Sequence, residues 1–146
     1  MRPRKLATAL AALIVALLSP AVAAAASTLS LPAKGKLDQD GHVRLTVKYS
    51  CPVTTSPQDS ILWLYSTQDE PNFAAGDTTV MVTCDGKRRK YRASLGPNIG
   101  EPTFVPGTVF VEAFLGAGAA TTHAYDSAFV SVRSRPRHGD QSSFAW

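Results

Sequence analysis

The sequence predicts an all-β protein, an antiparallel β-sandwich of about seven strands and immunoglobulin-like outline. Short segments in which apolar and polar residues alternate recur along the chain, and Pro- and Gly-containing turns separate most of them. No segment after residue 26 shows the sustained period of 3.6 residues that indicates a helix. Short strands at this spacing are typical of two sheets packed face to face.

Residues 1–26 have the layout of a secretory signal peptide, which we expect to be removed. Three basic residues precede the apolar run 6–18, and small residues follow it. The run is too short to span a membrane. We therefore expect cleavage between Ala23 and Ala26, a secreted protein, and no membrane partner once the peptide is removed.

The remaining chain suits one domain, residues 27–133, followed by a flexible polar tail, residues 134–146. Three of the 15 basic residues lie in the leader and all 11 acidic residues follow it, so the mature protein would carry twelve basic residues and a net charge of +1. A nearly neutral domain is a poor electrostatic match for nucleic acid, and we expect no such partner.

The two cysteines, Cys51 and Cys84, both lie in the part expected to be exported. Two cysteines in an oxidising compartment predict one disulfide. Closing a loop of this length would stabilise the fold by roughly 3–4 kcal/mol. Their separation excludes a CxxC redox motif.

The clearest strand is residues 42–51, HVRLTVKYSC, whose odd-numbered side chains would face the core. The preceding KGKLDQDG contains turn residues and is expected to be a connection. The other expected strands are residues 28–32, 61–66, 78–84, 87–95, 107–115 and 126–133.

Asp85-Gly86 lies between two alternating segments and predicts a hairpin with a two-residue type I′ turn. In that register Cys84 would lie opposite Lys87, and directly opposed residues would share a face. The two flanking strands would then be neighbours in one sheet.

The same register points Arg88, Lys90 and Arg92 to the outer face, beside other polar residues. The simpler interpretation is a solvated strand face. The alternative is an anion site for wall polymers or acidic glycans. Arg89 would fall on the inner face near the turn, where its long side chain can reach water.

Aromatic residues mark the outer faces of the last two expected strands. Phe110 and Phe114 alternate with an aliphatic core face, and Phe129 lies on the outer face of the final strand. If the two strands pair, the three rings form a stripe, which Leu62 and Leu64 would widen if their strand lies alongside. An exposed apolar patch of this kind marks a partner or ligand surface.

The alternative is that the chain covers this stripe itself, or that the two faces are the other way round. Phe144 and Trp146 are apolar residues in an otherwise polar tail. They would either fold back over the outer sheet or extend into solvent.

No residue set predicts catalysis. His123, Asp126 and Ser127 are close in sequence, but neighbours on a strand alternate between faces, and a catalytic triad requires convergence in space. No serine has the Gly-x-Ser-x-Gly elbow, and neither cysteine is expected to be a free thiol. No cofactor is expected.

Two acidic segments are candidate cation sites. Asp38 and Asp40 have the alternating oxygens of a calcium loop but lack the further ligands, so a hairpin turn is the better interpretation. Asp69, Glu70 and Asp77 would form a weak cation site only if their loop brings them together; a solvated loop is simpler. We expect no metal.

Trp63 follows Cys51 by twelve residues, on the next expected strand, and this arrangement resembles an immunoglobulin-like sandwich. The sequence departs from that family at Cys84, which falls on the fourth expected strand, and at Val82, where antibody domains have tyrosine. The resemblance therefore implies the sandwich and not the antibody disulfide topology.

Three motifs, GKLDQDGHVRLTVKYSCP, VTCDGKRRKY and PGTVFVEAFL, occur together behind the leader. With them the chain resembles a family of small secreted actinobacterial proteins that have an immunoglobulin-like domain of unknown function. The resemblance covers residues 27–133 and implies secretion and an all-β domain. It implies no activity and no binding residues.

Three functions remain open at this point. The favoured one is a non-catalytic extracellular binding or adhesion module, whose partner is an extracellular protein or a cell-wall glycan. An inhibitor of a secreted hydrolase, presenting the loop from Pro52 to Pro57 or from Gly96 to Pro106, is the second. A small extracellular enzyme is the third, and the lack of a convergent acid–base set disfavours it.

Overall fold

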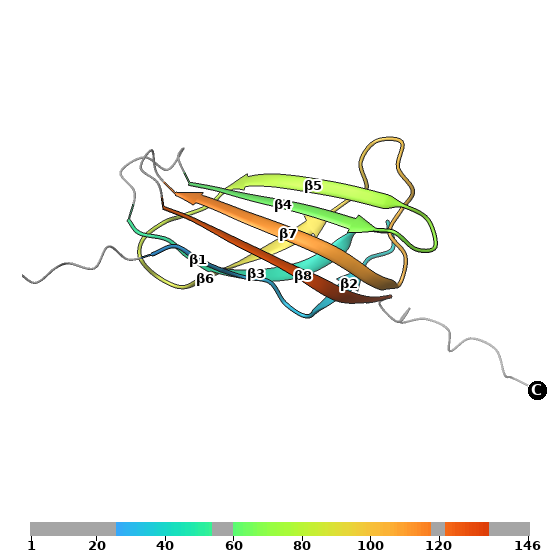
Figure 1. Ribbon diagram of the computed structural model, residues 1–146, viewed down its shortest axis with the longest axis horizontal. Coiled ribbons are helices and arrows are strands. Elements are labelled where there is room, and N and C mark those ends of the chain that lie inside the picture. The colour runs from blue at the N-terminus through green and yellow to red at the C-terminus, as the bar shows by residue number, and fades with distance from the viewer. Residues whose placement is uncertain (1–25, 54–59, 118–121, 135–146) are drawn as a thin grey trace, which may run out of the picture.

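In the computed structural model, residues 26–53, 60–117 and 122–134 are described, and they form eight strands and no helix (Figure 1). The strands join in one sheet of order β1-β3-β2-β8-β7-β4-β5, with β6 on the other edge of β3. Their bounds are β1 (Thr28–Ser30), β2 (Lys34–Leu37), β3 (Val43–Ser50), β4 (Ser60–Gln68), β5 (Ala74–Met81), β6 (Arg89–Leu95), β7 (Gly107–Ala117) and β8 (Thr122–Ser134).

Strand β2 joins two groups of strands, because it pairs antiparallel with β3 and parallel with β8. The described residues contain eight strands, where about seven were expected, and the expectation of an antiparallel arrangement was wrong for one pair, because β2 and β8 are parallel. Lys34–Leu37 was expected to be a connection because KGKL has no alternation of apolar residues. Its backbone pairs on both edges, and these hydrogen bonds make it a strand despite its composition.

The sheet bends so that both groups contribute to a single hydrophobic core. Figure 1 shows β5, β4, β7 and β8 side by side, with β3 and β6 in a second group. The alternation predicted for β3 is confirmed, since its odd-numbered residues are buried. Fully buried core residues from the two groups include Val43, Val47, Leu95, Leu62, Leu64, Val111, Leu115 and Val130.

The hairpin predicted at Asp85-Gly86 is not formed. β5 pairs with β4 and β6 pairs with β3, so Cys84 does not lie opposite Lys87. Gly86 has the positive φ of 78° that such a turn uses, but its amide donates to the Cys51 carbonyl at 2.9 Å. After this turn the chain continues as β6, which pairs with β3. An alternating strand can bury its inner face beside more than one neighbour, so the turn residues do not decide which strand it pairs with.

The predicted disulfide between Cys51 and Cys84 is confirmed, with a Cα–Cα distance of 4.9 Å. Both residues are buried. The bond joins the residue after β3 to the segment that connects β5 to β6. This segment crosses from one strand group to the other and is not part of a strand, so the disulfide holds it in place. We call it the crossing.

The segment after β6 closes the other end of the core. Phe104, which belongs to no alternating segment, is 1% exposed. Gln68, at the end of β4, is buried; its side-chain amide donates to the Val105 carbonyl at 3.0 Å and its oxygen accepts from the Val105 amide at 2.9 Å. A buried amide satisfied in both directions fixes this loop to β4.

The same segment packs tightly against β5. The Asn98 amide donates to the Ala75 carbonyl at 2.7 Å. A Cβ atom added at Gly76 would lie only 2.0 Å from the carbonyl oxygen of Gly96, so only glycine allows this approach.

We expect Gly76→Ala to lower the free energy of unfolding by about 2 kcal/mol or more, because the added methyl overlaps a backbone oxygen and one of the two segments must move. Urea unfolding measures the loss. Thr79→Ala, an exposed change on the same strand, is the control and should have a much smaller effect. Equal stability of Gly76→Ala and the wild type would contradict this packing.

Candidate functional site

The outer face of β4, β7 and β8 carries most of the exposed aromatic side chains, and we call it the aromatic face. Trp63 lies opposite Phe114, and Phe114 opposite Tyr125, across the three strands. Directly opposed residues share a face. The aromatic face consists of Trp63, Tyr65, Phe110, Phe114, Tyr125 and Phe129.

The rings of this face contact one another in pairs. Trp63 and Tyr65 are parallel, with centroids 5.9 Å apart. Phe110 and Phe129 have centroids 5.1 Å apart. Phe129 is 73% exposed and Tyr125 56%, and Phe114 is also exposed, whereas Trp63, Tyr65 and Phe110 are half-buried. Phe110, Phe114 and Phe129 thus lie together on the outside, as the alternation predicted.

Leu62 and Leu64 do not belong to this surface. Their strand lies beside β7, as the prediction required, but both side chains are fully buried. Trp63 and Tyr65 take the outward positions instead. Both alternating faces of this strand are apolar, so the sequence left its inward face open; the register, with Leu62 opposite Leu115 of the aliphatic face, decides it. Trp63 consequently does not occupy the core position that an immunoglobulin-like pattern implies.

Carboxylates lie on and beside the aromatic face. The Tyr125 hydroxyl donates to Glu112 Oε1 at 2.5 Å, and this hydrogen bond is the main cause that raises the pKa of Tyr125. Asp77 is exposed on β5, directly opposite Tyr65. Asp69 and Glu70 line a hollow of about 830 Å³ with Phe110 and Phe129.

The cation site considered for Asp69, Glu70 and Asp77 finds no support. Among the described residues, no group of three or more His, Cys, Asp or Glu side chains is arranged to hold a metal ion. Asp69 and Glu70 follow β4, whereas Asp77 is on β5 beside Tyr65.

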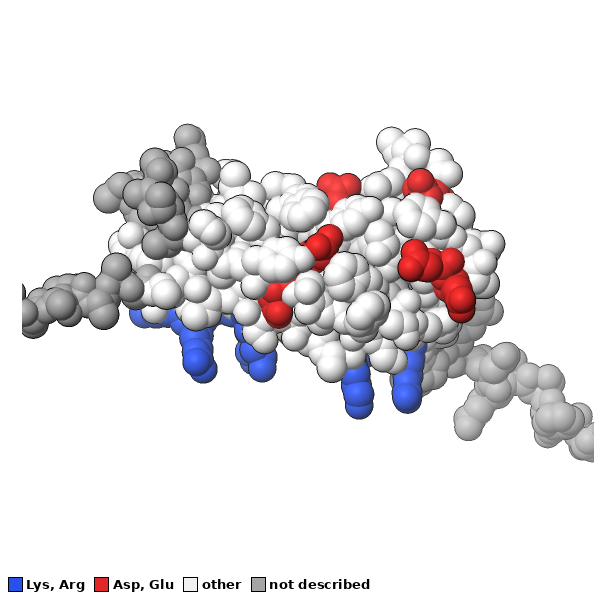
Figure 2. Space-filling view, viewed as in Figure 1, with Lys and Arg blue, Asp and Glu red and all other residues white. Residues whose placement is uncertain are grey.

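A second surface, which we call the basic face, is the outer face of β2, β3 and β6 with the adjoining end of β8. Figure 2 shows Lys and Arg side chains projecting together from one side of the molecule, whereas Asp and Glu lie elsewhere on the visible surface. The basic face comprises Lys34, Lys36, Arg44, Lys48, Arg88, Lys90, Arg92 and Arg133, all exposed. The predicted outward direction of Arg88, Lys90 and Arg92 agrees with this, but their neighbour is β3 and not β5.

In the described part of the chain, Asp38 is the one acidic residue that forms an ion pair with the basic face. Its carboxylate accepts from Arg44 at 2.8 Å and from the backbone amides of Asp40 and His42. Partial burial acts to raise its pKa, but these hydrogen bonds together lower it. Asp38 therefore serves the turn between β2 and β3, in line with the hairpin interpretation of this segment.

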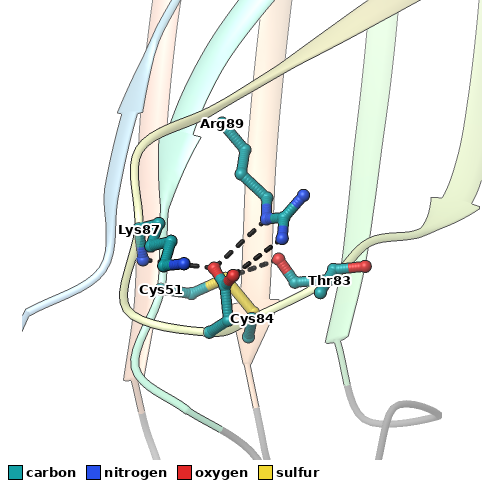
Figure 3. A network of polar contacts seen from close by, with 6 residues as sticks. Cys51, Thr83, Cys84, Lys87 and Arg89 are labelled. Carbon is teal, nitrogen blue, oxygen red and sulfur yellow. Dashed lines mark hydrogen bonds and ion pairs between the residues drawn. A yellow bond between two sulfur atoms is a disulfide. The ribbon is translucent and has the colours of Figure 1, made fainter.

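Arg89 leaves the inner face through an ion pair that the sequence did not reveal (Figure 3). Its guanidinium donates to both carboxylate oxygens of Asp85, at 3.1 and 2.7 Å. This hydrogen bond, followed by that from the Lys87 amide, lowers the pKa of Asp85 to about 2. The pair lies beside the Cys51–Cys84 disulfide and reinforces the same crossing.

His123, Asp126 and Ser127 do not converge. The Asp126 carboxylate accepts from the Leu31 backbone amide at 2.8 Å and thereby joins β8 to the segment after β1. His123 lies on the outer face, with its ring 6.0 Å from that of Phe114. Asp126 therefore points to the opposite face of β8 from His123 and Ser127.

Several sequence predictions fall on residues outside the described ranges. They are the signal peptide up to residue 25, most of the loop from Pro52 to Pro57, and the tail with Phe144 and Trp146. Of the described residues, none form a helix long and apolar enough to cross a membrane.

We expect Asp85→Asn to reduce thermal stability near pH 6 and to lose this effect in acid. Since the folded-state pKa is about 2 and the ordinary value is 3.8, the charged carboxylate stabilises the fold above about pH 4, and that contribution disappears as the pH falls through about 2. Melting temperatures of the wild type, Asp85→Asn, Arg89→Gln and the double variant test it. The two single changes should be non-additive near pH 6 and independent near pH 2; additivity at both would show that the pair is not coupled.

Comparison with models of known protein families and with the curated proteins finds no match. The resemblance to secreted actinobacterial proteins therefore stays a prediction from the sequence. The function has to be inferred from the surfaces of the protein itself.

Proposed function

We propose that this protein is a secreted, non-catalytic binding module of immunoglobulin-like sandwich outline, and that it binds a basic extracellular protein through the aromatic face. The predicted leader and the disulfide support secretion. The two strand groups that share one core support the sandwich. The open, clustered rings support binding.

The exposure of the aromatic face is the observation on which the proposal depends. Folding alone buries large rings, since each offers considerable apolar area. Here the chain instead directs aliphatic side chains inward and rings outward on three adjacent strands. Exposed apolar patches mark partner surfaces, and aromatic residues dominate the energetics of protein interfaces.

The charges around the rings favour a partner that presents lysine or arginine. Glu112 and Asp77 lie among the rings, and Asp69 and Glu70 line the hollow beside Phe110 and Phe129. A cationic side chain entering this region would meet both carboxylates and ring faces, and cation–π contacts add to the attraction. Neutral glycans lack that complementarity.

A peptide array tests this function directly. We expect the protein to bind peptides from extracellular proteins, with an affinity that rises with their Lys and Arg content and falls as the salt concentration is raised. Phe129→Ser or Glu112→Gln should each lower this affinity at least tenfold. Phe129→Ser should change the free energy of unfolding by less than about 1 kcal/mol, because the side chain is already exposed.

The matched control is Phe73→Ser, since Phe73 is also exposed but lies outside the aromatic face. Its affinity for the same peptides should equal that of the wild type. Binding to a neutral glycan array with no peptide binding would contradict the proposal, as would a large loss of stability in Phe129→Ser.

A second candidate function rests on Ile99. This residue is fully exposed in the loop that follows β6. The loop is held by the hydrogen bond from Asn98 to Ala75, and by Phe104 and Gln68 further along. A rigid loop with an apolar tip is the geometry by which inhibitors occupy the substrate cleft of a hydrolase.

If the protein is such an inhibitor, it should inhibit a secreted protease of apolar specificity at one-to-one stoichiometry, and Ile99→Asp should abolish inhibition with no loss of stability. Residual protease activity during titration measures it. Cleavage of the loop as an ordinary substrate would contradict this function.

A further inference from the structure

We propose that the basic face is a binding site for a linear anionic polymer that carries phosphate or carboxylate groups and no nucleobases. This site lies on strands other than those of the aromatic face and does not depend on the function proposed above. The argument starts from the strand register, which decides how the cations are spaced.

The register places like charges directly opposite one another. Lys48 lies opposite Lys90 across β3 and β6. Lys36 lies opposite Arg44 on one side and Arg133 on the other. Directly opposed like charges destabilise a sheet. Folding therefore gives no reason for this arrangement, whereas an anionic ligand would turn the repulsion into attraction.

Intramolecular acids neutralise little of this charge. Asp38 pairs with Arg44 at 2.8 Å, and Asp85 pairs with Arg89, which lies outside the basic face. Within the described part of the chain, no ion pair involves Lys36, Lys48 or Lys90. Much of the face is thus free to meet an external anion, even though the domain as a whole is nearly neutral.

The basic face contains two hollows, which lie at different positions along β3. One, of about 740 Å³, is lined by cations from three strands, Lys34 and Lys36 of β2, Arg44 of β3 and Arg92 of β6. The other, of about 490 Å³, contains Lys48, Arg88 and Lys90.

Arg44 and Lys48 are four residues apart on β3, so the two hollows lie about 13 Å from each other along the strand. Outward residues on one strand recur about every 7 Å. A single small anion would use one hollow, whereas a polymer with regularly repeated anionic groups would occupy both. The extended row of cations therefore favours a linear polymer.

The other side chains of this face argue for a polymer without bases. Between the cations are hydroxyl residues, Thr46 and Ser94. In the described part of β2, β3 and β6, no aromatic residue occupies an outward position. Proteins that bind single-stranded nucleic acid combine cations with aromatic rings on which bases stack, and those rings are here on other strands.

Titration of the full-length protein with defined polymers tests the site. The probes are linear polyphosphate, polygalacturonate and a single-stranded DNA oligonucleotide, with dextran as the neutral polymer. We expect polyphosphate or polygalacturonate to bind, and the comparison of the two separates phosphate from carboxylate recognition. With four cations engaged, affinity should fall about sevenfold for each doubling of salt.

Lys48→Gln and Lys90→Gln should each weaken this binding about fivefold and should leave stability unchanged or slightly raised, since each removes a like-charge repulsion. Lys87→Gln is the matched control, because it removes the same charge from an exposed residue outside the basic face. It should alter affinity less than twofold. Phe129→Ser should have no effect.

Three outcomes would overturn the proposal. One is an equal loss in Lys87→Gln and Lys48→Gln, which would show that net charge alone attracts the polymer. Another is tighter binding of single-stranded DNA than of either other anion. The last is no binding of either polymer at low salt.

Discussion

The burial of every second side chain in one shared core is the constraint on which the rest of this structure depends. Val47 and Val111 come from the two strand groups and meet in the same cluster. Once these aliphatic residues point inward, the intervening residues must point outward, because successive strand residues alternate between faces. Both the aromatic face and the basic face are consequences of this single choice of orientation.

The crossing between the two groups needs its own fastening, because no strand ladder runs through it. The Cys51–Cys84 disulfide, the Gly86 amide and the Asp85–Arg89 pair hold its beginning. Gln68 holds the loop that follows β6 with two hydrogen bonds. The covalent bond and these polar contacts thus stabilise the crossing, as backbone hydrogen bonds stabilise the sheet. They also keep the aromatic face and the basic face in a fixed position relative to each other.

The aromatic face and the basic face have opposite electrostatic character, although the charge of the domain as a whole is nearly neutral. Acidic residues such as Glu112 lie among the rings, and cations such as Lys48 gather on other strands (Figure 2). Because the two ligands proposed here would occupy different strands, they would not compete. A module with both proposed sites would bind a basic protein and an anionic polymer at the same time. It would thereby attach one to the other, as an adhesion protein does.

Local sequence patterns determined the all-β class, the inward faces of β3 and β7, the outward direction of Phe129, and the disulfide, because alternation and the pairing of two cysteines depend on the chain alone. They did not determine which strands are neighbours. The Asp85-Gly86 turn suited a hairpin, yet β6 pairs with β3. The opposition of Lys48 to Lys90, the burial of Phe104 and the strand formed by KGKL arise from contacts between residues distant in sequence. Only the tertiary structure decided these, since the free energy that selects them comes from burial and pairing across the whole fold.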